Sequence, residues 1–351
     1  RHSLKAWGYR VGNYKEAFDT DWQTFSSDML DYCVQDVEVT HSLFTMIENR
    51  GYSEQAMKLE HDVASLIFRQ EQHGFTFDKE KAQQLYSKLN ARRAELEEEF
   101  QKLFKPITTK RISPKTGKQL KDKITVFNPS SRLHIADRLK TKYNWQPDVY
   151  TSDGKPKLDD TILSKLDYPE AKLLAEHFLL DKRIGQLATG AQAWLKNETN
   201  GKIHGTCNTN STVTARASHS HPNLGQVPSV SVPYGKDCRS LFTVPKNKKL
   251  VGIDISGLEV RMLAHFMSKY DDGEYSKVVL EGDIHTETQK LAGLESRDLA
   301  KRFYYAFLYG SGVKKIALIT NKKVSEASKI KKRFLNNLPA LNKLITQVQS
   351  A

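Results

Sequence analysis

The sharpest signal in the sequence is the stretch K-L-V-G-I-D-I-S-G-L-E, residues 249–259. Its largely apolar residues 250–253 predict a short buried strand that ends at Asp254, and Ser256 begins a predicted helix. A carboxylate at the end of a buried strand is held rigidly and still reaches solvent, which suits a hard divalent cation with oxygen ligands. The alternative is that Asp254 is a turn residue and that Ser256-x-x-Glu259 is a helix capping box.

A second motif follows in R-D-L-A-K-R-F-Y-Y-A-F-L-Y-G-S-G, residues 297–312. Ser296 can cap a helix here, and the two glycines near its end can terminate it. A spacing of four residues places one slowly winding stripe on this helix, made of Arg297, Lys301, Tyr305 and Tyr309. Two cations followed by two aromatic rings suit a ligand with phosphates at one end and a base or sugar at the other. The alternative is an ordinary core helix with Phe303 and Phe307 buried, which would still leave the stripe available to a ligand.

A third segment, T-V-T-A-R-A-S-H-S-H-P-N-L-G-Q-V-P, occupies residues 212–228. It is polar, rich in turn residues and free of aromatic side chains, so by itself it predicts a loop. Its long hydrogen-bonding side chains are Arg216, Asn223 and Gln226.

Long helices are predicted over most of the chain that precedes residue 202. They cover Ser27–Glu48, a segment that ends at Gly74, Lys79 to about Leu103 after the cap Asp78, and Pro169 to about Trp194. Residues 105–124 contain Pro, Gly and Lys without periodicity and predict a basic loop. Short β-like runs follow Lys202, and a Lys-rich helix is predicted from Ser325 to Leu338. The sequence therefore predicts an α+β protein.

The charge of the chain is concentrated in two blocks. The chain carries 54 Lys and Arg against 41 Asp and Glu, a formal charge of +13. Residues 101–145 have a net charge of +10 and residues 297–335 of +9, so the remainder sums to −6. Two basic blocks on a mildly acidic body indicate a polyanion that is bound at two places, and the alternative is a solvated basic surface.

Several classes of protein are excluded by composition. The three cysteines, Cys33, Cys207 and Cys238, lie far apart, which supports neither a disulfide framework nor a zinc site. The mean hydropathy is −0.58. No apolar run approaches the roughly 18 residues that span a bilayer, so no membrane-spanning protein is expected.

Together and in this order, the three segments resemble the DNA polymerase I family (family A), and within it the replicative polymerases of short-tailed bacteriophages. The segment 212–228 is similar to the first palm motif, D-I-S-G-L-E-x-R from Asp254 to motif A, and R-x-x-x-K-x-x-x-Y-x-x-x-Y-G from Arg297 to motif B of the fingers. G-D-I-H-T at residues 282–286 lies between the last two, as in that family.

The resemblance implies a right-hand polymerase fold. The thumb would comprise residues 56–201, the first part of the palm residues 202–266, and the fingers residues 267–351. Residues 1–55 would be the C-terminal remnant of an RNase H-like 3′-5′ exonuclease domain, in which D-Y-C-V-Q-D-V supplies Tyr32 to orient water and Asp36 as a metal ligand.

The activity implied by this resemblance is template-directed nucleotidyl transfer from a dNTP to a primer 3′-hydroxyl in phage DNA replication, in the cytoplasm of a bacterial host. Asp254 and the backbone carbonyl of Ile255 would bind two Mg²⁺ ions. The nucleotide-binding residues would be His285, Arg297 and Lys301 for the triphosphate, Tyr305 for the sugar and base, Glu259 to exclude ribonucleotides, and Tyr309 beside the templating base.

The same resemblance implies DNA-binding residues. Arg216 would reach the minor groove at the primer end, with Asn223 and Gln226 nearby, where an Arg can test pair geometry without reading sequence. Lys182 and Arg183 would contact backbone phosphates, and the basic loop 105–124 would lie near the duplex. Other expected partners are replisome proteins, namely a helicase-primase and a single-stranded DNA-binding protein.

The sequence departs from the family pattern in four respects. The first exonuclease carboxylates would precede Arg1, so no proofreading is expected from these residues. The third polymerase motif, H-D-E, would lie beyond Ala351, so residues 1–351 alone are expected to incorporate little. The thumb loop is short, whereas some phage relatives recruit thioredoxin through a long insertion there, so thioredoxin dependence is not expected. Ala215 replaces a usual glycine, which is expected to restrict the turn before Arg216.

Two other interpretations remain open at this point. The chain could be a non-catalytic or split polymerase segment that only binds primer-template DNA or associates with a partner carrying the missing motif. A nuclease built around Tyr32 and Asp36 is less favoured, because its other ligands are missing from the sequence.

Overall fold

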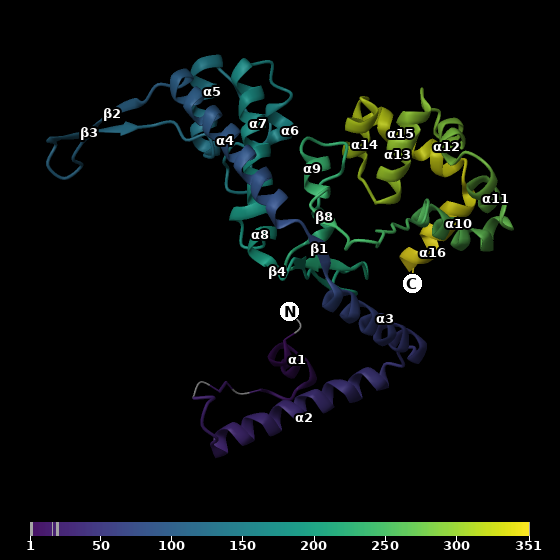
Figure 1. Ribbon diagram of the computed structural model, residues 1–351. Coiled ribbons are helices and arrows are strands. Elements are labelled where there is room, and N and C mark those ends of the chain that lie inside the picture. Colours follow the sequence, from purple (N-terminus) through teal and green to yellow (C-terminus); the bar gives the residue numbers. More distant parts are fainter. Residues whose placement is uncertain (1–2, 16, 19–20, 351) are drawn as a thin grey trace. The chain divides into compact units, whose positions relative to one another are not determined.

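The computed structural model describes residues 3–15, 17–18 and 21–350 (Figure 1). The described residues divide into two compact units, on either side of the bond between Leu250 and Val251. Each unit has its own hydrophobic core. No helix of the described residues is both long and apolar enough to cross a membrane.

The first unit begins with three capped helices, α1 (Leu4–Val11), α2 (Ser27–Asn49) and α3 (Glu54–His73). The Ser26 and Ser53 side chains accept hydrogen bonds from backbone N–H groups in the first turns of α2 and α3. Gly74 ends α3 with φ of 63°, a conformation that glycine adopts without strain. The two helices predicted here are confirmed.

A small antiparallel sheet follows α3. Its order is β4 (Glu198–Thr199), β5 (Lys202–Ile203), β1 (Phe75–Phe77) and β8 (Phe242–Thr243). Phe75 pairs with Ile203, and Phe77 pairs with Phe242. Because Phe77 and Ile203 are both buried, the sheet joins the segment after α3 to the core of the first unit.

The core of the first unit lies between α4 (Lys79–Leu103) and α7 (Pro169–Ile184), which pack together. Asp78 caps α4, and both ends of this helix agree with the prediction. The smaller elements around the core are α5 (Arg132–Tyr143), α6 (Asp160–Leu163) and α8 (Trp194–Asn197). The prediction of one helix from Pro169 to Trp194 holds only as far as Ile184, because a π-helical turn at Gly185–Thr189 follows it.

The basic segment 105–124 is not a loop, so that prediction is wrong. It forms a two-stranded antiparallel hairpin of β2 (Ile107–Ile112) and β3 (Gln119–Thr125), with an irregularity in register between Thr109 and Arg111. Figure 1 shows the hairpin extending from the region of α4 and α5. Most of its side chains are exposed on both faces, so the alternation that marks a half-buried strand is absent from the sequence.

The polar segment after β5 contains short elements. They are β6 (Thr206–Asn208), which pairs with β7 (Ser218–Ser220), the 3₁₀ turn η2 (Leu224–Gln226) and the helix α9 (Gly235–Arg239). The first of the β-like runs predicted after Lys202 is therefore split between β5 and β6, which belong to different sheets. This segment returns the chain to the core, in which Cys238 and Leu241 are buried.

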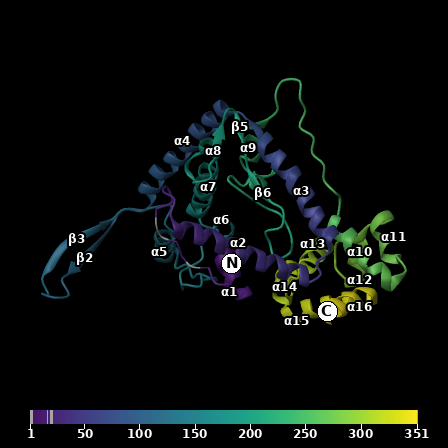
Figure 2. The same cartoon turned by 90° about the horizontal axis from the view of Figure 1, so that it is seen from below.

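The second unit is helical. It contains α10 (Leu258–Asp271), α11 (Glu274–Glu281), α12 (Ile284–Ala292), α13 (Arg297–Leu308), α14 (Val313–Thr320), α15 (Val324–Asn336) and α16 (Pro339–Ser350). Helix α12 packs against α13 and α15, and α16 packs against α10 (Figure 2). The core of this unit is centred on Phe303, Tyr304 and Phe334, which are fully buried.

Two local predictions at residues 249–259 are wrong. Residues 250–255 form no strand, and Val251 and Ile253 are exposed, because no strand of the described residues pairs with this segment. Helix α10 begins at Leu258 after Gly257, which has φ of 60°, and no side chain caps it. The predicted capping box between Ser256 and Glu259 is therefore absent.

The division into exonuclease remnant, thumb, palm and fingers stays a prediction. The structure draws its boundary elsewhere, since helix α10 shares one core with α13 although the predicted boundary at residue 266 separates them. Residues 203–241 likewise share their core with the helices of residues 79–187.

Candidate functional site

Helix α13 carries the predicted stripe of charged and aromatic residues. The Ser296 hydroxyl accepts a hydrogen bond from the Leu299 N–H at 3.2 Å, so the predicted cap is confirmed. Arg297 and Lys301 are exposed and Tyr305 is half-buried. Phe303 is fully buried, which confirms that it belongs to the core face. The helix therefore buries one face and leaves its cations accessible to an anion.

Arg297 forms an ion pair with Asp283, a residue that the motifs of the sequence did not single out. The Arg297 Nε lies 2.5 Å from Asp283 Oδ2, and Arg297 Nη2 lies 3.2 Å from Oδ1. Asp283 is also the N-cap of α12, where its Oδ1 accepts from the His285 N–H at 3.0 Å. The hydrogen bonds from Arg297 and then from Thr286 hold the pKa of Asp283 well below its usual range. The G-D-I-H-T motif could have indicated this cap, but not its partner on another helix.

His285 lies in the first turn of α12, next to the aromatic residues of α13. Its ring centroid is 5.8 Å from that of Tyr305 and 6.3 Å from that of Tyr304. Its Nδ1 is buried without a hydrogen-bond partner among the described residues. Burial, followed by the charges of Arg297 and Lys301, lowers the pKa of His285, so the imidazole is neutral at pH 7. The structure thus brings together three of the residues predicted to bind a triphosphate.

Glu259 and Tyr309, predicted for different roles, meet directly. The Tyr309 hydroxyl donates a hydrogen bond of 2.8 Å to Glu259 Oε1. Glu259 lies in the first turn of α10, and Tyr309 is the C-cap of α13. A second pair inside the core supports this arrangement, since the Tyr275 hydroxyl on α11 donates to that of Tyr304 on α13 at 3.0 Å. The buried role of Tyr304 was missed because the sequence Phe303-Tyr304-Tyr305 does not reveal which ring faces inward.

Asp254 and Ile255 lie in the exposed segment that precedes α10. Across residues 3–15, 17–18 and 21–350 there is no group of three or more His, Cys, Asp or Glu side chains that could hold a metal ion. Mg²⁺ is commonly bound by one or two carboxylates together with substrate phosphates and waters. A carboxylate next to an accessible backbone carbonyl fits that donor set, although the predicted rigid strand beneath it is absent.

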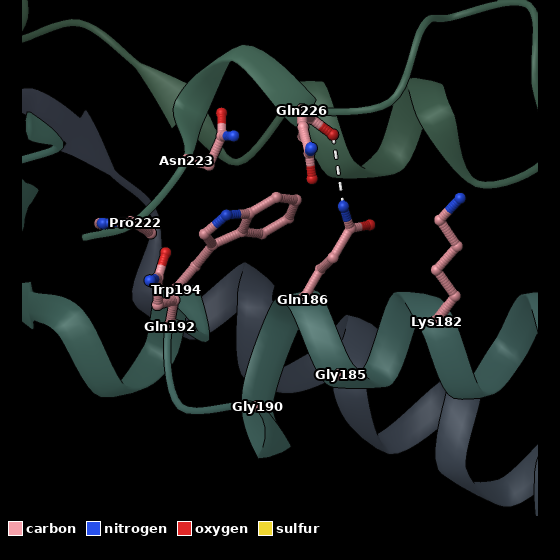
Figure 3. A pocket seen from close by; sticks show the side chains of 9 residues that line it. All are labelled: Lys182, Gly185, Gln186, Gly190, Gln192, Trp194, Pro222, Asn223 and Gln226. Atoms are coloured by element: carbon pink, nitrogen blue, oxygen red, sulfur yellow. Dashed lines mark hydrogen bonds between the residues drawn. The ribbon is translucent and has the colours of Figure 1, made fainter. Parts of the chain in front are cut away.

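The first unit contains an open pocket of about 290 Å³ that three predicted DNA-binding residues line (Figure 3). Lys182 comes from α7, and Asn223 and Gln226 come from the polar segment opposite. Figure 3 shows the Trp194 ring between the two sides of the pocket. The remaining lining residues are Gly185, Gln186, Gly190, Gln192 and Pro222. The amide side chains and the one cation of this pocket suit a ligand with polar edges, whereas Trp194 is only 2% exposed and forms its floor.

Arg183 does not lie where a direct phosphate contact requires it. Only 6% of this residue is exposed, and its Nη1 donates to Gln186 Oε1 at 2.9 Å. Gln186 in turn donates from Nε2 to the Gln226 carbonyl at 3.3 Å. In this structure the Arg183 guanidinium is buried and supports Gln186, and its contact with backbone phosphates stays a prediction.

Arg216 lies in an exposed turn. Its N–H donates to the Thr212 hydroxyl at 2.9 Å, and that hydroxyl donates back to the Arg216 carbonyl at 3.2 Å. Ala215 has φ of 57°, so this turn does require a left-handed residue, as expected from the missing glycine. The contact of Arg216 with DNA stays a prediction.

The proposed exonuclease pair is engaged within the N-terminal helices. Lys15 Nζ lies 2.5 Å from Asp36 Oδ1 and 4.2 Å from the centroid of the Tyr32 ring. Phe18 and Trp22 also contact this ring. The Lys15 ammonium group therefore pairs with Asp36 in this structure, and the metal-binding role of Asp36 stays a prediction.

Comparison with known proteins identifies the family. Residues 79–351 match the model of DNA polymerase family A. The DNA-directed DNA polymerases of Escherichia phage T7 and Enterobacteria phage T3 are each 36% identical to this chain, covering 99% of it and 64% of their own length. DNA polymerase I of Helicobacter pylori strain 26695 is 30% identical over 64% of this chain and 25% of its own. The T7 alignment spans 449 residues against 351 here, so that relative carries segments that this chain lacks.

A solved structure shows the same fold. It is described as the POL domain of Pol1 from M. smegmatis in complex with DNA primer-template and dNTP, and it matches with a TM-score of 0.69 at 18% sequence identity, over 99% of this chain and 58% of the other. The ordered motifs of residues 212–228, 254–261 and 297–310, the helical unit that carries the last of them, and the family match over residues 79–351 lead to one conclusion: the chain belongs to DNA polymerase family A.

Proposed function

We propose that the protein is a DNA-directed DNA polymerase that transfers nucleotides from deoxynucleoside triphosphates to a primer 3′-hydroxyl under the direction of a template. Family membership and the names of the T7 and T3 relatives support this proposal. The observation that carries it is helix α13, on which Arg297 and Lys301 are exposed beside His285 and Tyr305.

The triphosphate would bind at the N-terminal half of α13. Arg297 and Lys301 supply the positive charge, and the guanidinium can make planar paired hydrogen bonds to phosphate oxygens. His285, in the first turn of α12, would donate a ring N–H to a phosphate oxygen. Tyr305, which contacts the His285 ring, would lie against the sugar and base.

Selection of the sugar would depend on the pair of Glu259 and Tyr309. The hydrogen bond from the Tyr309 hydroxyl orients the Glu259 carboxylate at the beginning of α10. A carboxylate held beside C2′ of the sugar leaves no room for a ribose hydroxyl, so deoxyribonucleotides would be favoured. Tyr309 would then have its ring available to the templating base.

Magnesium would be held by Asp254 and the carbonyl of Ile255. When bound, two Mg²⁺ ions lower the pKa of the 3′-hydroxyl and neutralise charge on the α-phosphate and the leaving pyrophosphate. The residues of this chain then have three tasks: Asp254 orients the cation, Arg297 and Lys301 orient the phosphates, and Tyr305 orients the nucleoside. We further propose that residues 1–351 incorporate little by themselves, because the described residues contain no group of three or more His, Cys, Asp or Glu side chains that could hold a metal ion.

Primer-template DNA would contact the first unit through Arg216, the pocket of Lys182, Asn223 and Gln226, and the basic hairpin β2–β3. Action during phage DNA replication in the host cell, alongside a helicase-primase and a single-stranded DNA-binding protein, is part of the same proposal.

The proposal is tested by equilibrium binding and by primer extension. Titration of residues 1–351 with dGTP and Mg²⁺ is expected to show binding that Arg297→Ala or Lys301→Ala weakens by at least about tenfold, the equivalent of removing one charge-assisted hydrogen bond. Arg302→Ala is the matched control, since Arg302 is an exposed cation on the same helix whose side chain pairs with Asp298. Equal weakening in all three variants would point to general electrostatic attraction and would contradict a dedicated triphosphate site.

The role of Asp254 is tested in the longest natural form of the protein. Primer extension that requires Mg²⁺ is expected there, and Asp254→Ala is expected to remove it while the affinity for primer-template DNA is retained. If the Asp254→Ala variant extends primers at the unchanged rate, the assignment of this residue to the metal is wrong.

A further inference from the structure

One carboxylate connects the two helices that carry the predicted triphosphate ligands. Asp283 Oδ1 accepts hydrogen bonds from the His285 N–H and from Arg297 Nη2, and Oδ2 accepts from the Thr286 hydroxyl at 2.8 Å and from Arg297 Nε. Two of these four hydrogen bonds fix the beginning of α12, and the other two fix the guanidinium at the beginning of α13. A single side chain therefore links His285 to Arg297 across the two packed helices α12 and α13.

The pairing also determines which edge of the guanidinium is engaged. Asp283 contacts the edge formed by Nε and Nη2. The edge formed by Nη1 and Nη2 is the one that can make paired hydrogen bonds with a phosphate group. When Asp283 holds the Nε and Nη2 edge, the Nη1 and Nη2 edge of Arg297 points in a fixed direction. Without this ion pair the Arg297 side chain would sample many rotamers.

We propose that Asp283 is a positioning residue that orients Arg297 for the triphosphate and keeps it in register with His285. The inference rests on the proposed function, because it assumes that a nucleotide triphosphate binds along α13. Its content is separate: Asp283 acts on the nucleotide through Arg297 and does not touch the nucleotide itself.

Stability of the fold does not account for this arrangement. The side chains of Asp283 and Arg297 are 41% and 57% exposed, and exposed ion pairs contribute little to folding. Charge repulsion alone predicts that removal of the Asp283 carboxylate raises the affinity for the nucleotide, the opposite of what the positioning role predicts. A carboxylate close to a triphosphate repels it, so removal of that charge should strengthen nucleotide binding if orientation of Arg297 were unimportant.

The substitution Asp283→Asn separates these effects. The amide oxygen can keep the cap on α12, because Asn is as good an N-cap as Asp. The amide NH₂ would face the Arg297 Nε–H, so two donors would oppose each other and this hydrogen bond would be lost, which leaves only the longer contact from Nη2 to hold Arg297. We expect the dissociation constant of dGTP to rise about tenfold, as for the removal of a charge-assisted hydrogen bond. The matched control is Asp298→Asn. This substitution also removes one negative charge, but Asp298 lies on α13 and its partner is Arg302.

The experiment measures binding of dGTP and of inorganic tripolyphosphate to residues 1–351 by calorimetry. Asp298→Asn is expected to change either constant less than about twofold, because its partner Arg302 lies outside the proposed site. In an Arg297→Ala background, Asp283→Asn should cause no further weakening, because the two substitutions act through the same group. Tighter binding in Asp283→Asn, or effects that add in the double variant, would overturn the proposal.

A second readout does not depend on nucleotide. In ¹⁵N-arginine spectra, the Arg297 Nε–H is expected to exchange slowly with water in the wild type and in Asp298→Asn, and rapidly in Asp283→Asn. If the Nε–H is protected as expected but wild type binds neither dGTP nor tripolyphosphate, the proposed function fails at this site and the positioning role falls with it. If nucleotide binds but the Nε–H exchanges equally in wild type and Asp283→Asn, only the positioning role is refuted.

Discussion

The three cysteines occupy three different environments. Cys33 is exposed on α2, Cys207 is half-buried in β6, and Cys238 in α9 is buried. Burial is the main cause that raises the pKa of the Cys238 thiol to about 11, whereas an unperturbed thiol titrates near about 8.5. Since the thiolate is the reactive form, these environments predict a large difference in reactivity.

At mildly alkaline pH we expect Ellman's reagent to modify Cys33 rapidly and Cys238 only after unfolding. Cys33→Ser should remove the fast phase, and Cys238→Ser should leave it unchanged. The raised pKa of Cys238 also makes the stability of the fold depend on pH. Keeping Cys238 protonated stabilises the fold below the unfolded pKa of about 8.5, and this contribution declines as the pH rises toward about 11. A fast phase that survives in Cys33→Ser would contradict the assignment.

Residue types were easier to predict from the sequence than residue partners. Spacing alone placed Arg297, Lys301 and Tyr305 on one helix, and the structure confirms that helix. The ion pair with Asp283 and the burial of Arg183 were not predictable, because both depend on contacts between elements. A helical pattern shows which side chains share one face of the helix, but not which other element packs against that face.

At the scale of elements, the π-helical turn at Gly185–Thr189 illustrates how two glycines can have different roles. A Cβ on Gly185 would meet nothing within 4 Å, whereas a Cβ on Gly190 would lie 2.6 Å from the carbonyl oxygen of Gly185. Such turns are uncommon and are frequent at functional sites. Both glycines line the pocket of Lys182, Asn223 and Gln226.

We therefore expect opposite effects from the same substitution. Gly185→Ala should stabilise the first unit by up to about 1 kcal/mol, because alanine loses less backbone entropy in a helical turn. Gly190→Ala should destabilise it by about 1–3 kcal/mol, because backbone must move to relieve the close approach. Urea unfolding followed by circular dichroism measures both changes. Equal effects at the two positions would show that the turn is not built as described.

The predicted elements failed where neighbours determine structure. Residues 107–125 form a hairpin without a buried face, so their sequence lacks the alternation that identifies strands. Residues 250–255 have the apolar composition of a strand, but no strand of the described residues pairs with them. Capped helices such as α4, whose signals are local, were predicted to within one residue.

At the scale of the whole molecule, the charge of +13 is concentrated in two blocks, one in each compact unit. The block at residues 101–145 includes the hairpin, and the block at residues 297–335 includes α13, α14 and most of α15. The two blocks can be identified by counting charges along the sequence, without knowledge of the fold. It did not show that the first block projects as a hairpin whose cations are exposed on both faces.

This exposure predicts that the hairpin makes a salt-dependent contribution to DNA binding. Removing one phosphate-binding cation should reduce the slope of log affinity against log salt by about 0.9 for duplex DNA. We expect a smaller slope on a primer-template duplex when six hairpin cations are changed to Gln, namely Lys110, Arg111, Lys115, Lys118, Lys121 and Lys123. The control changes six exposed lysines outside both basic blocks, Lys58, Lys81, Lys88, Lys236, Lys246 and Lys277, which alters net charge equally. Because long-range attraction depends on net charge and direct binding on position, equal slopes in the two variants would show that the hairpin does not touch the DNA backbone.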